Sequence, residues 1–330
     1  MIIQLKKNVS QNQIAEIAKN YEGIEVKYDS KTFIVTSYKT KEIEEKFEKD
    51  IEKTWVMDSD FQLSSKKFIP NTRKIKIGDF VTGSDKTLLT IGPCSVESEE
   101  MIEQTAQLIV KNGLSSIRAG AFKPRTSPYS FQGLGEKGLK LLAKVREKYG
   151  LKVITEVRDS THVDMVIDYA DVVQVGAKSM YDHGILRACG RSTKPILIKR
   201  GFGTTLQELT QAAEFVLSGG NPNVIICERG IRTFETKSRF TLDLCGVAYL
   251  KEFSNLPIIL DPSHAMGYAY GIPDLARACM AMNVDGLLIE VHPNPAVAKS
   301  DASQQLDHAS FQNLLKTLKP IAKAVGKEIV

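Results

Sequence analysis

Residues 152–199 read KVITEVRDSTHVDMVIDYADVVQVGAKSMYDHGILRACGRSTKPILIK and set the pattern for most of the chain. Short apolar runs at Lys152–Glu156, Val172–Val175 and Pro195–Lys199 alternate with longer segments of helical periodicity. This alternation is typical of parallel βα units, in which each buried strand is followed by a helix that covers the sheet. The stretch therefore predicts an α/β fold built on a parallel sheet.

The same pattern continues in both directions and gives eight strands in total. The other five are expected at Leu88–Ile91, Ser116–Ala119, Val224–Cys227, Pro257–Leu260 and Gly286–Ile289. Their spacing of roughly 30 residues is what one βα repeat requires. Eight units favour a closed (β/α)8 TIM barrel over an open sheet. The first strand is not followed by Gly-x-Gly-x-x-Gly, which weakens the alternative of a dinucleotide-binding sheet.

Residues 1–65 show a different order: strand, helix, strand, strand, helix, strand. The strands are expected at Ile2–Leu5, Gly23–Tyr28, Thr32–Ser37 and Lys53–Asp58, and the helices at Gln11–Asn20 and Lys41–Ile51. That order predicts a small α+β ferredoxin-like domain. Because it carries no constellation of catalytic side chains, we expect it to bind or regulate.

Residues 66–87 are expected to connect the small domain to a catalytic barrel at residues 88–330. The stretch Ser64–Lys74 has neither helical nor strand periodicity and is interpreted as a linker. A hairpin follows, with one strand at Lys74–Phe80 and its return at Lys86–Leu89. The sequence thus predicts two domains and one short connection.

The composition limits the classes of function. The chain has 330 residues, of which 42% are hydrophobic, and a modest net charge of +5 without a basic run, so nucleic-acid or membrane binding is not implied. The amino-terminal residues lack the pattern of a signal peptide, and no apolar stretch reaches membrane-spanning length, so we expect a cytoplasmic protein. Five cysteines without paired spacing indicate reduced thiols rather than a disulfide framework.

Each of the eight predicted strands ends on a polar or charged group. In strand order these are Cys94, Arg118, Glu156, Gln174 with Lys178, Lys199 with Arg200, Glu228 with Arg229, Asp261 with His264, and Glu290 with His292. In a barrel they all lie at the carboxyl-terminal mouth, where active sites form. Any one of them is explained by the solvation of loops. Eight of eight, rich in arginine and lysine, favour a functional site.

Many of these residues are cations, and a crowded set of cations requires an anionic ligand. The set comprises Arg118, Lys123, Arg125, Lys178, Lys199, Arg200 and Arg229. Arginine suits phosphate and carboxylate oxygens through paired hydrogen bonds, and lysine adds a point charge. We therefore expect two phosphates, or a phosphate and a carboxylate. Ion pairs with Glu156 or Glu228 are the alternative for Arg200 and Arg229.

A metal site is predicted at the same mouth. Cys94, His264 and Glu290 follow strands one, seven and eight, which become neighbours when the barrel closes, and Asp301 follows in the next loop. These four residues suit a divalent ion. The thiolate and imidazole favour Zn, Fe or Co, and the carboxylates also admit Mn. Two of the polar residues also have a structural interpretation. Cys94 alone could be a small buried residue, and His292 alone could cap its loop.

Six segments carry a family resemblance. They are Gly92-Pro93-Cys94-Ser95, Lys123-Pro124-Arg125-Thr126-Ser127, Leu197-Ile198-Lys199-Arg200-Gly201, Cys227-Glu228-Arg229-Gly230, Asp261-Pro262-Ser263-His264 and Glu290-Val291-His292-Pro293. In this order, from about Leu88 to Asp307, the chain resembles the 3-deoxy-D-arabino-heptulosonate 7-phosphate (DAHP) synthases. The resemblance is strongest to the subgroup with a ferredoxin-like domain ahead of the barrel.

The resemblance implies condensation of phosphoenolpyruvate with erythrose 4-phosphate, the first step of the shikimate pathway to aromatic amino acids. By motif, Cys94, His264, Glu290 and Asp301 would hold the metal; Arg118, Lys123, Lys199 and Arg229 would hold phosphoenolpyruvate; Arg125, Thr126 and Ser127 would receive the aldose phosphate. With the metal on the aldehyde oxygen, Lys123 is the expected acid, with Lys199 as its competitor. Glu156 and Glu228 are expected to position or deprotonate the attacking water.

Two departures from the family pattern bear on the substrate. The chain has Gly176-Ala177-Lys178 where the family usually has Gly-Ala-Arg, so Lys178 keeps the charge for phosphoenolpyruvate but loses the bidentate fork. The segment Gly267-Tyr268-Ala269-Tyr270-Gly271 replaces the usual Gly-Arg-Arg-Asp. We interpret both as neutral drift, with a shifted aldose as the alternative.

Two other functions remain as alternatives. The related octulosonate 8-phosphate synthases use arabinose 5-phosphate, but their loop after strand two normally carries Asn-Arg-Ser in place of Lys123-Pro124-Arg125-Thr126. A catalytically silent sensor is the second alternative, and the four metal candidates disfavour it. The resemblance further implies an aromatic amino-acid effector, tyrosine or phenylalanine, at the amino-terminal domain, and a homotetramer.

Overall fold

The computed structural model describes residues 1–123 and 127–330. Within these residues eight parallel strands close into a barrel, because β14 pairs with β7 as well as with β13. The strands are β7 (Lys86–Gly92), β8 (Ser116–Arg118), β9 (Lys152–Val157), β10 (Val172–Val175), β11 (Ile196–Lys199), β12 (Val224–Glu228), β13 (Ile258–Leu260) and β14 (Gly286–Glu290). Each lies within two residues of its predicted bounds, so the predicted barrel is confirmed.

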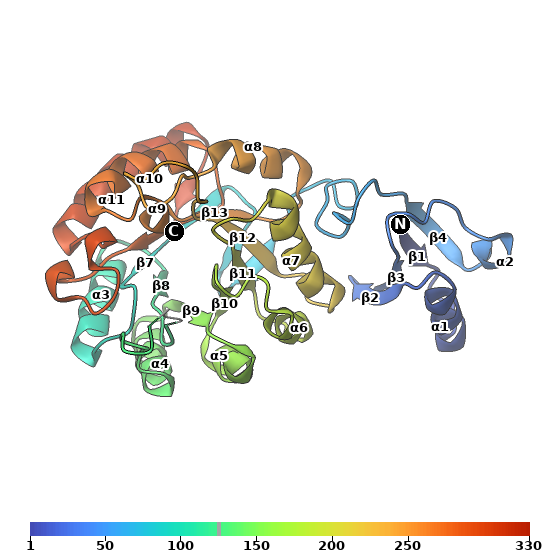
Figure 1. The fold of residues 1–330 in the computed structure, drawn as a ribbon, viewed down its shortest axis with the longest axis horizontal. Helices are drawn as coiled ribbons and strands as arrows, with labels where there is room; N and C mark the ends of the chain where they lie inside the picture. Colours follow the sequence, from blue (N-terminus) through green and yellow to red (C-terminus); the bar gives the residue numbers. More distant parts are fainter. Residues whose placement is uncertain (124–126) are drawn as a thin grey trace.

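Helices surround the barrel, as Figure 1 shows. They are α3 (Glu99–Lys111), α4 (Glu136–Tyr149), α5 (Val163–Tyr169), α6 (His183–Arg191), α7 (Leu206–Ser218), α8 (Leu244–Phe253), α9 (Pro262–Met266), α10 (Ile272–Ala281) and α11 (His308–Ala324). Side chains fix where they begin: Ser98 caps α3, and Thr205 and Glu208 form a reciprocal capping box at α7. None of the described helices is long and apolar enough to cross a membrane.

The barrel interior is filled by alternate residues of its strands. One buried cluster joins Leu88, Ile154, Val172, Leu197, Ile225, Ile259 and Leu288 with Ile75, Ile77 and Phe80. The last three belong to a hairpin of β5 (Ile75–Ile77) and β6 (Phe80–Thr82). The hairpin lies at the amino-terminal ends of the strands, where its Gly78 approaches Lys152 at the start of β9. One end of the barrel is therefore closed by apolar side chains, and the carboxyl end is left for a site.

The predicted return of this hairpin at Lys86–Leu89 is wrong. The chain already reverses at Gly78 and Asp79, and Ile77 pairs with Phe80. Gly78 has φ +62°, a conformation that glycine adopts at little cost and that suits a two-residue turn. Residues 86–89 instead form the first part of β7. The carboxyl-terminal strand β15 (Glu328–Ile329) pairs with the same strand.

The amino-terminal residues form a separate four-stranded sheet. Its elements are β1 (Ile2–Leu5), α1 (Gln11–Asn20), β2 (Ile24–Tyr28), β3 (Lys31–Val35), α2 (Glu45–Glu48) and β4 (Ile51–Trp55). The strand order is β2-β3-β1-β4, with antiparallel pairing throughout. The element order is the predicted one, but the second helix is one short turn instead of Lys41–Ile51, because Ile51 already pairs with Leu5.

The amino-terminal sheet lies beside α7 of the barrel (Figure 1). The segment between them is tightly held although it contains no regular element. Glu214 of α7 accepts hydrogen bonds from the backbone N–H groups of Gln62, Leu63 and Ser64, at 2.9, 3.0 and 2.8 Å. The buried Arg73 donates to Asn255 Oδ1 at 2.8 Å. The predicted linker is therefore fixed to the barrel surface.

Candidate active site

A cavity opens at the carboxyl ends of the barrel strands. It is lined by Lys123, Glu156, Ala177, Lys178, Lys199, Phe202, Arg229, Arg239, His264 and Asp301. Five of these ten residues are lysine or arginine. Positive charge focused in a concave site attracts anions, so the cavity suits a ligand with several negative charges.

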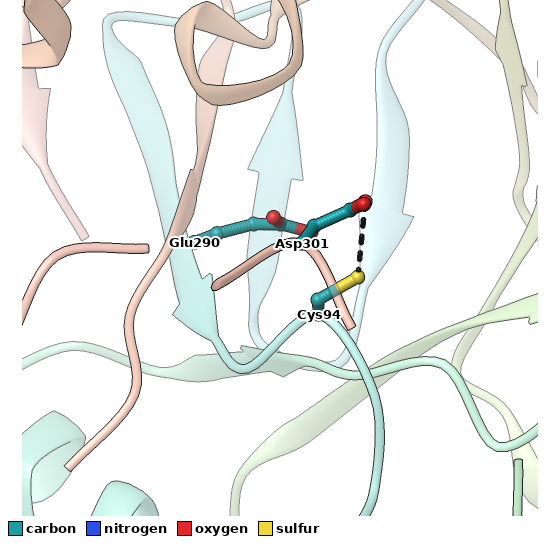
Figure 2. A group of neighbouring side chains, drawn as sticks. All are labelled: Cys94, Glu290 and Asp301. Carbon is teal, nitrogen blue, oxygen red and sulfur yellow. Dashed lines mark hydrogen bonds between the residues drawn. The ribbon is translucent and has the colours of Figure 1, made fainter. Parts of the chain in front are cut away.

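Predicted metal ligands converge at the base of this cavity. Cys94 follows β7, Glu290 ends β14 and Asp301 lies in the loop after β14, and one potential ligand atom of each lies within 4.8 Å of the others (Figure 2). Cys94 Sγ and Asp301 Oδ2 are 3.4 Å apart. The fourth predicted ligand, His264 of α9, borders the group, with its Nε2 3.5 Å from Glu290 Oε1.

Burial and neighbouring charges set the protonation of this group. Burial, assisted by the charge of Glu290, raises the pKa of Cys94 to about 12. Burial also acts to raise the pKa values of Glu290 and Asp301, but nearby positive charges outweigh it and lower both. The charge of His264 acts on both carboxylates; Arg118 adds to it at Glu290, and Arg239 adds to it at Asp301. Two carboxylates thus lie beside a protonated thiol. A bound cation would reverse the preference of the thiol, because a coordinating thiol is deprotonated.

Two buried cations contact the same group. Arg118 Nη1 donates to Glu290 Oε1 at 2.7 Å and to the carbonyl oxygen of Pro93 at 2.8 Å. Lys123 Nζ lies 3.1 Å from Cys94 Sγ and 3.2 Å from the carbonyl oxygen of Cys94. Burial acts to lower the pKa of Lys123, but the neighbouring Cys94 and Glu156 raise it. The ammonium group therefore stays protonated. It lies between the cavity and the cluster of Cys94, Glu290 and Asp301, which we call the metal-donor group.

Asp261 links a lysine of the cavity wall to the histidine. Its Oδ2 lies 2.5 Å from Lys199 Nζ and 2.8 Å from His264 Nδ1. Although burial would raise the pKa of Asp261, the charges of His264 and Lys199 hold it well below its ordinary value. Asp261 Oδ2 and His264 Nδ1 lie at ion-pair distance but outside hydrogen-bond geometry, so the carboxylate favours one orientation of the imidazole through its charge and leaves Nε2 for a metal.

Arg229 stacks on an aromatic pair and keeps donors for a ligand. Its guanidinium lies 4.2 Å from the ring centre of Phe240 and 5.2 Å from that of Phe202. Burial lowers the pKa of Arg229. Its buried Nη1 has no hydrogen-bond partner among residues 1–123 and 127–330. A buried donor without an acceptor costs free energy, and an acceptor atom of a bound ligand would remove that cost.

Glu156 lies on the opposite wall, at the end of β9. Its Oε2 accepts a hydrogen bond of 2.7 Å from Gln174 Nε2. Gly176 makes room for it, because a Cβ atom there would come 2.2 Å from Glu156 Oε1. Lys178, two residues after Gly176, also lines the cavity. Gly176 is thus required because a larger residue would collide with a carboxylate of the site.

The other predicted glutamate is differently placed. Glu228 is buried and does not line the cavity; its Oε2 accepts from Arg200 Nη1 at 2.8 Å, and its Oε1 accepts from the backbone N–H of Gly230 at 2.6 Å. Arg200 also pairs with Asp243 at 2.8 Å. The alternative of an ion pair with a glutamate is therefore correct for Arg200, which pairs with Glu228. Arg229 lines the cavity instead.

The residues expected at the aldose are described only in part. Ser127 is exposed, and its Oγ accepts from the backbone N–H of Tyr129 at 3.3 Å. Arg125 and Thr126 lie outside the described residues. The rings of Tyr268 and Tyr270 stack at 5.8 Å and are exposed by 44% and 74%. Neither tyrosine lines the cavity.

Two residues of the site were not predicted, and a third was predicted at the barrel mouth without a role. The third is Asp261, whose position three residues before His264 could have indicated its contact with the imidazole. Arg239 follows β12 in a segment without helix or strand, and no periodic signal points to it. Gln304 lies in a short 3₁₀ turn (Ala302–Gln304) after Asp301 and contacts both Glu290 and Arg239.

Comparison with known proteins identifies the family of the chain. The DAHP synthetase I family matches residues 60–327. A phospho-2-dehydro-3-deoxyheptonate aldolase from Thermotoga maritima is 42% identical over 269 residues, which cover 82% of this chain and 80% of that protein. A 2-dehydro-3-deoxyphosphooctonate aldolase from Fusobacterium nucleatum is 31% identical over 276 residues, which cover 78% of this chain and 98% of that protein.

Solved structures give the same result. A crystal structure of the Thermotoga maritima phospho-2-dehydro-3-deoxyheptonate aldolase (DAHP synthase) matches with a TM-score of 0.81 and 37% identity, and the match covers 100% of this chain and 99% of that one. A truncated 3-deoxy-D-arabino-heptulosonate 7-phosphate synthase from the same organism matches with a TM-score of 0.77 and 39% identity, over 82% of this chain and 99% of that one.

Proposed function

Because the chain belongs to the DAHP synthetase I family, we propose that it condenses phosphoenolpyruvate with erythrose 4-phosphate to 3-deoxy-D-arabino-heptulosonate 7-phosphate and inorganic phosphate. The observation that carries the proposal is the cavity itself. Five cations line it, and a thiol, two carboxylates and an imidazole gather at its base. Two phosphorylated substrates would account for the cations, and a divalent metal would account for the group at the base.

The donor residues fit a divalent transition metal. The potential ligands are one thiol sulfur, one imidazole nitrogen and the oxygens of two carboxylates, from Cys94, His264, Glu290 and Asp301. This set suits Mn, Fe, Zn or Co. When bound, such a metal acts as a Lewis acid on the aldehyde oxygen. Asp261 keeps the histidine oriented for this role, and Arg118 keeps Glu290 ionised.

Phosphoenolpyruvate is assigned to the cationic wall. Arg229, with its unpartnered buried donor, would bind the phosphate or the carboxylate through its fork, and Lys199 and Lys178 would add charge. Arg118 and Lys123 would contact the same substrate from the base of the cavity. The aldose phosphate would lie at the rim, toward Arg125, Thr126 and Ser127.

The residues of the cavity can perform the bond changes. The methylene carbon of phosphoenolpyruvate forms a bond to the aldehyde carbon, and Lys123 donates the proton that the aldehyde oxygen takes up. Water then adds to the cationic C2, where Glu156 positions it and accepts its proton. The bond from C2 to the phosphate oxygen breaks as the new hydroxyl becomes the ketone, and the hydroxyl proton leaves with the phosphate. We place Glu156 in this role ahead of Glu228, because Glu156 lines the cavity and both oxygens of Glu228 already accept hydrogen bonds.

A phosphate-release assay tests the proposal. Purified, metal-loaded protein is given phosphoenolpyruvate together with erythrose 4-phosphate, arabinose 5-phosphate or no aldose. We expect release that depends on the tetrose. Release with the pentose alone would transfer the chain to the octulosonate type of its 31% identical relatives, and release with neither would indicate a silent homologue.

The amino-terminal sheet carries a separate proposal. We assign residues 1–65 to a ferredoxin-like regulatory domain, residues 66–87 to the connection and residues 88–330 to the catalytic barrel; the strand order β2-β3-β1-β4 supports the first assignment. An aromatic amino acid is the expected effector. Calorimetric titration of the full chain with tyrosine and phenylalanine, alongside activity, tests it, and absence of both binding and inhibition would refute it. A homotetramer and a cytoplasmic location stay predictions.

A further inference from the structure

Gln304 lies buried between the metal-donor group and the cationic wall. Its Nε2 donates to Glu290 Oε2 at 2.6 Å, and its Oε1 accepts from Arg239 Nη1 at 2.7 Å. The side chain is almost fully buried, with 1% of the residue exposed. One uncharged side chain thus bridges a carboxylate of the base and a guanidinium of the wall.

The residue type matches this position for a chemical reason. An ionised carboxylate only accepts hydrogen bonds and a guanidinium only donates them, whereas a carboxamide can do both at once. A glutamate at position 304 would repel Glu290, and a lysine would repel Arg239. A buried apolar residue would leave the buried Glu290 short of a hydrogen bond, which is costly in a dry interior, and would leave Arg239 without this acceptor.

The first half of the bridge fixes the orientation of Glu290. Arg118 donates to Oε1 of this carboxylate at 2.7 Å, and Gln304 donates to Oε2. With one donor on each oxygen, the plane of the carboxylate is set. The same Oε1 lies 3.5 Å from His264 Nε2, on the side of the group formed with Cys94 and Asp301. Hydrogen bonds from outside a metal site to its ligands commonly control affinity.

The second half of the bridge holds Arg239 at the cavity. This side chain is 40% exposed and lines the cavity, and its Nη1 lies 3.7 Å from Asp301 Oδ2. Its guanidinium also lies 5.7 Å from the ring centre of Phe240, on which Arg229 stacks. An arginine is flexible unless its head is fixed, and Gln304 provides a fixed acceptor for it.

We propose that Gln304 is a positioning residue that holds Glu290 for the metal and Arg239 for an anionic substrate, so that the two halves of the site are aligned by one side chain. The inference rests on the proposed function, since it assumes a metal at the cysteine and carboxylates and a phosphorylated substrate in the cavity. Gln304 itself touches neither reactant.

Three variants separate the two halves. Gln304→Leu removes both hydrogen bonds, Arg239→Met removes only the cationic half, and Gln312→Leu on the outer helix α11 is the matched control. Co²⁺ affinity is measured by chelator competition, with the thiolate-to-cobalt absorption band as a spectroscopic readout. KM is measured for phosphoenolpyruvate and for the aldose phosphate. Thermal unfolding reports on folding.

We expect Gln304→Leu to weaken Co²⁺ binding by about 10- to 100-fold, the usual cost of removing an outer hydrogen bond to a ligand, and to shift the cobalt band. It should also raise the KM of the same substrate whose KM rises in Arg239→Met. Arg239→Met should keep the Co²⁺ affinity of the original protein. Gln312→Leu should change none of these quantities.

A folded Gln304→Leu protein with unchanged cobalt affinity, cobalt band and both KM values would overturn the inference, as would a lowered melting temperature with those quantities unchanged. If Gln304→Leu does not fold, Gln304→Met, which preserves chain length without either hydrogen bond, is judged by the same criteria. Absence of phosphate release from the unaltered protein would instead refute the proposed function. The cobalt measurements would still decide the metal half of the inference.

Discussion

The base and the rim of the cavity are built differently. At the base, Arg118, Lys123 and Glu290 are buried, and each contacts a partner of opposite charge or a ligand atom of the metal-donor group. Among the loop residues expected to bear on the aldose, Ser127 and Tyr270 are exposed, and Tyr270 stacks on another exposed tyrosine. We expect the buried residues to perform the chemistry and the exposed loop residues at the rim to select the aldose, as in other barrels. Changes at the base should therefore stop turnover, and changes at the rim should shift substrate preference.

The largest effect is expected for Lys123→Met. Loss of a positioned acid costs roughly 10²- to 10⁴-fold in rate, and Lys123 contributes charge for the substrate as well, so turnover should fall toward the upper end of that range. The metal should still bind, because Lys123 Nζ contacts Cys94 without being a ligand. Steady-state kinetics with metal analysis check this expectation. Near-normal turnover would remove Lys123 from the mechanism.

A smaller loss is expected for Asp261→Asn. The substitution keeps the shape but removes the charge that Lys199 and His264 share, and breaking a buried pair costs about 3–5 kcal/mol. We expect a lower melting temperature and metal affinity reduced about 10- to 100-fold. Chelator competition measures the affinity. Unchanged affinity would show that His264 is oriented without Asp261.

Metal affinity should rise with pH. Because burial raises the pKa of Cys94 to about 12, the thiol is protonated at neutral pH and loses its proton on binding a metal. Burial also lowers the pKa of His264, so the imidazole, charged at the acidic pH where the carboxylates titrate, is neutral above pH 7 and adds no further proton. Apparent affinity should therefore rise about tenfold per unit between about pH 7 and 8.5. Cys94→Ser is the control and should flatten the slope; a flat slope in the original protein would contradict thiolate binding.

The smallest effect is expected for Lys178→Arg. The arginine restores a bidentate fork at the cavity wall, so KM for phosphoenolpyruvate should fall about 2- to 10-fold with kcat nearly constant. KM for the aldose phosphate is the internal control. If the aldose KM changes instead, Lys178 belongs to the aldose end of the cavity.

The base was more predictable from the sequence than the rim. The barrel strands are periodic, and their polar ends, among them Arg118, Lys199 and Glu290, come together because parallel strands share one carboxyl edge. Glu228 ends a strand in the same way, yet it turns to Arg200, a choice between partners that periodicity does not encode. Arg239 and Gln304 lie on irregular segments, where only the folded chain shows which side chains meet.

The most direct test identifies the product. Metal-loaded protein is given phosphoenolpyruvate with equal concentrations of erythrose 4-phosphate and arabinose 5-phosphate, and the sugar acid is identified by mass spectrometry. The 42% identity to a heptonate aldolase predicts the seven-carbon acid as the main product. An eight-carbon acid as the main product would contradict the proposed function.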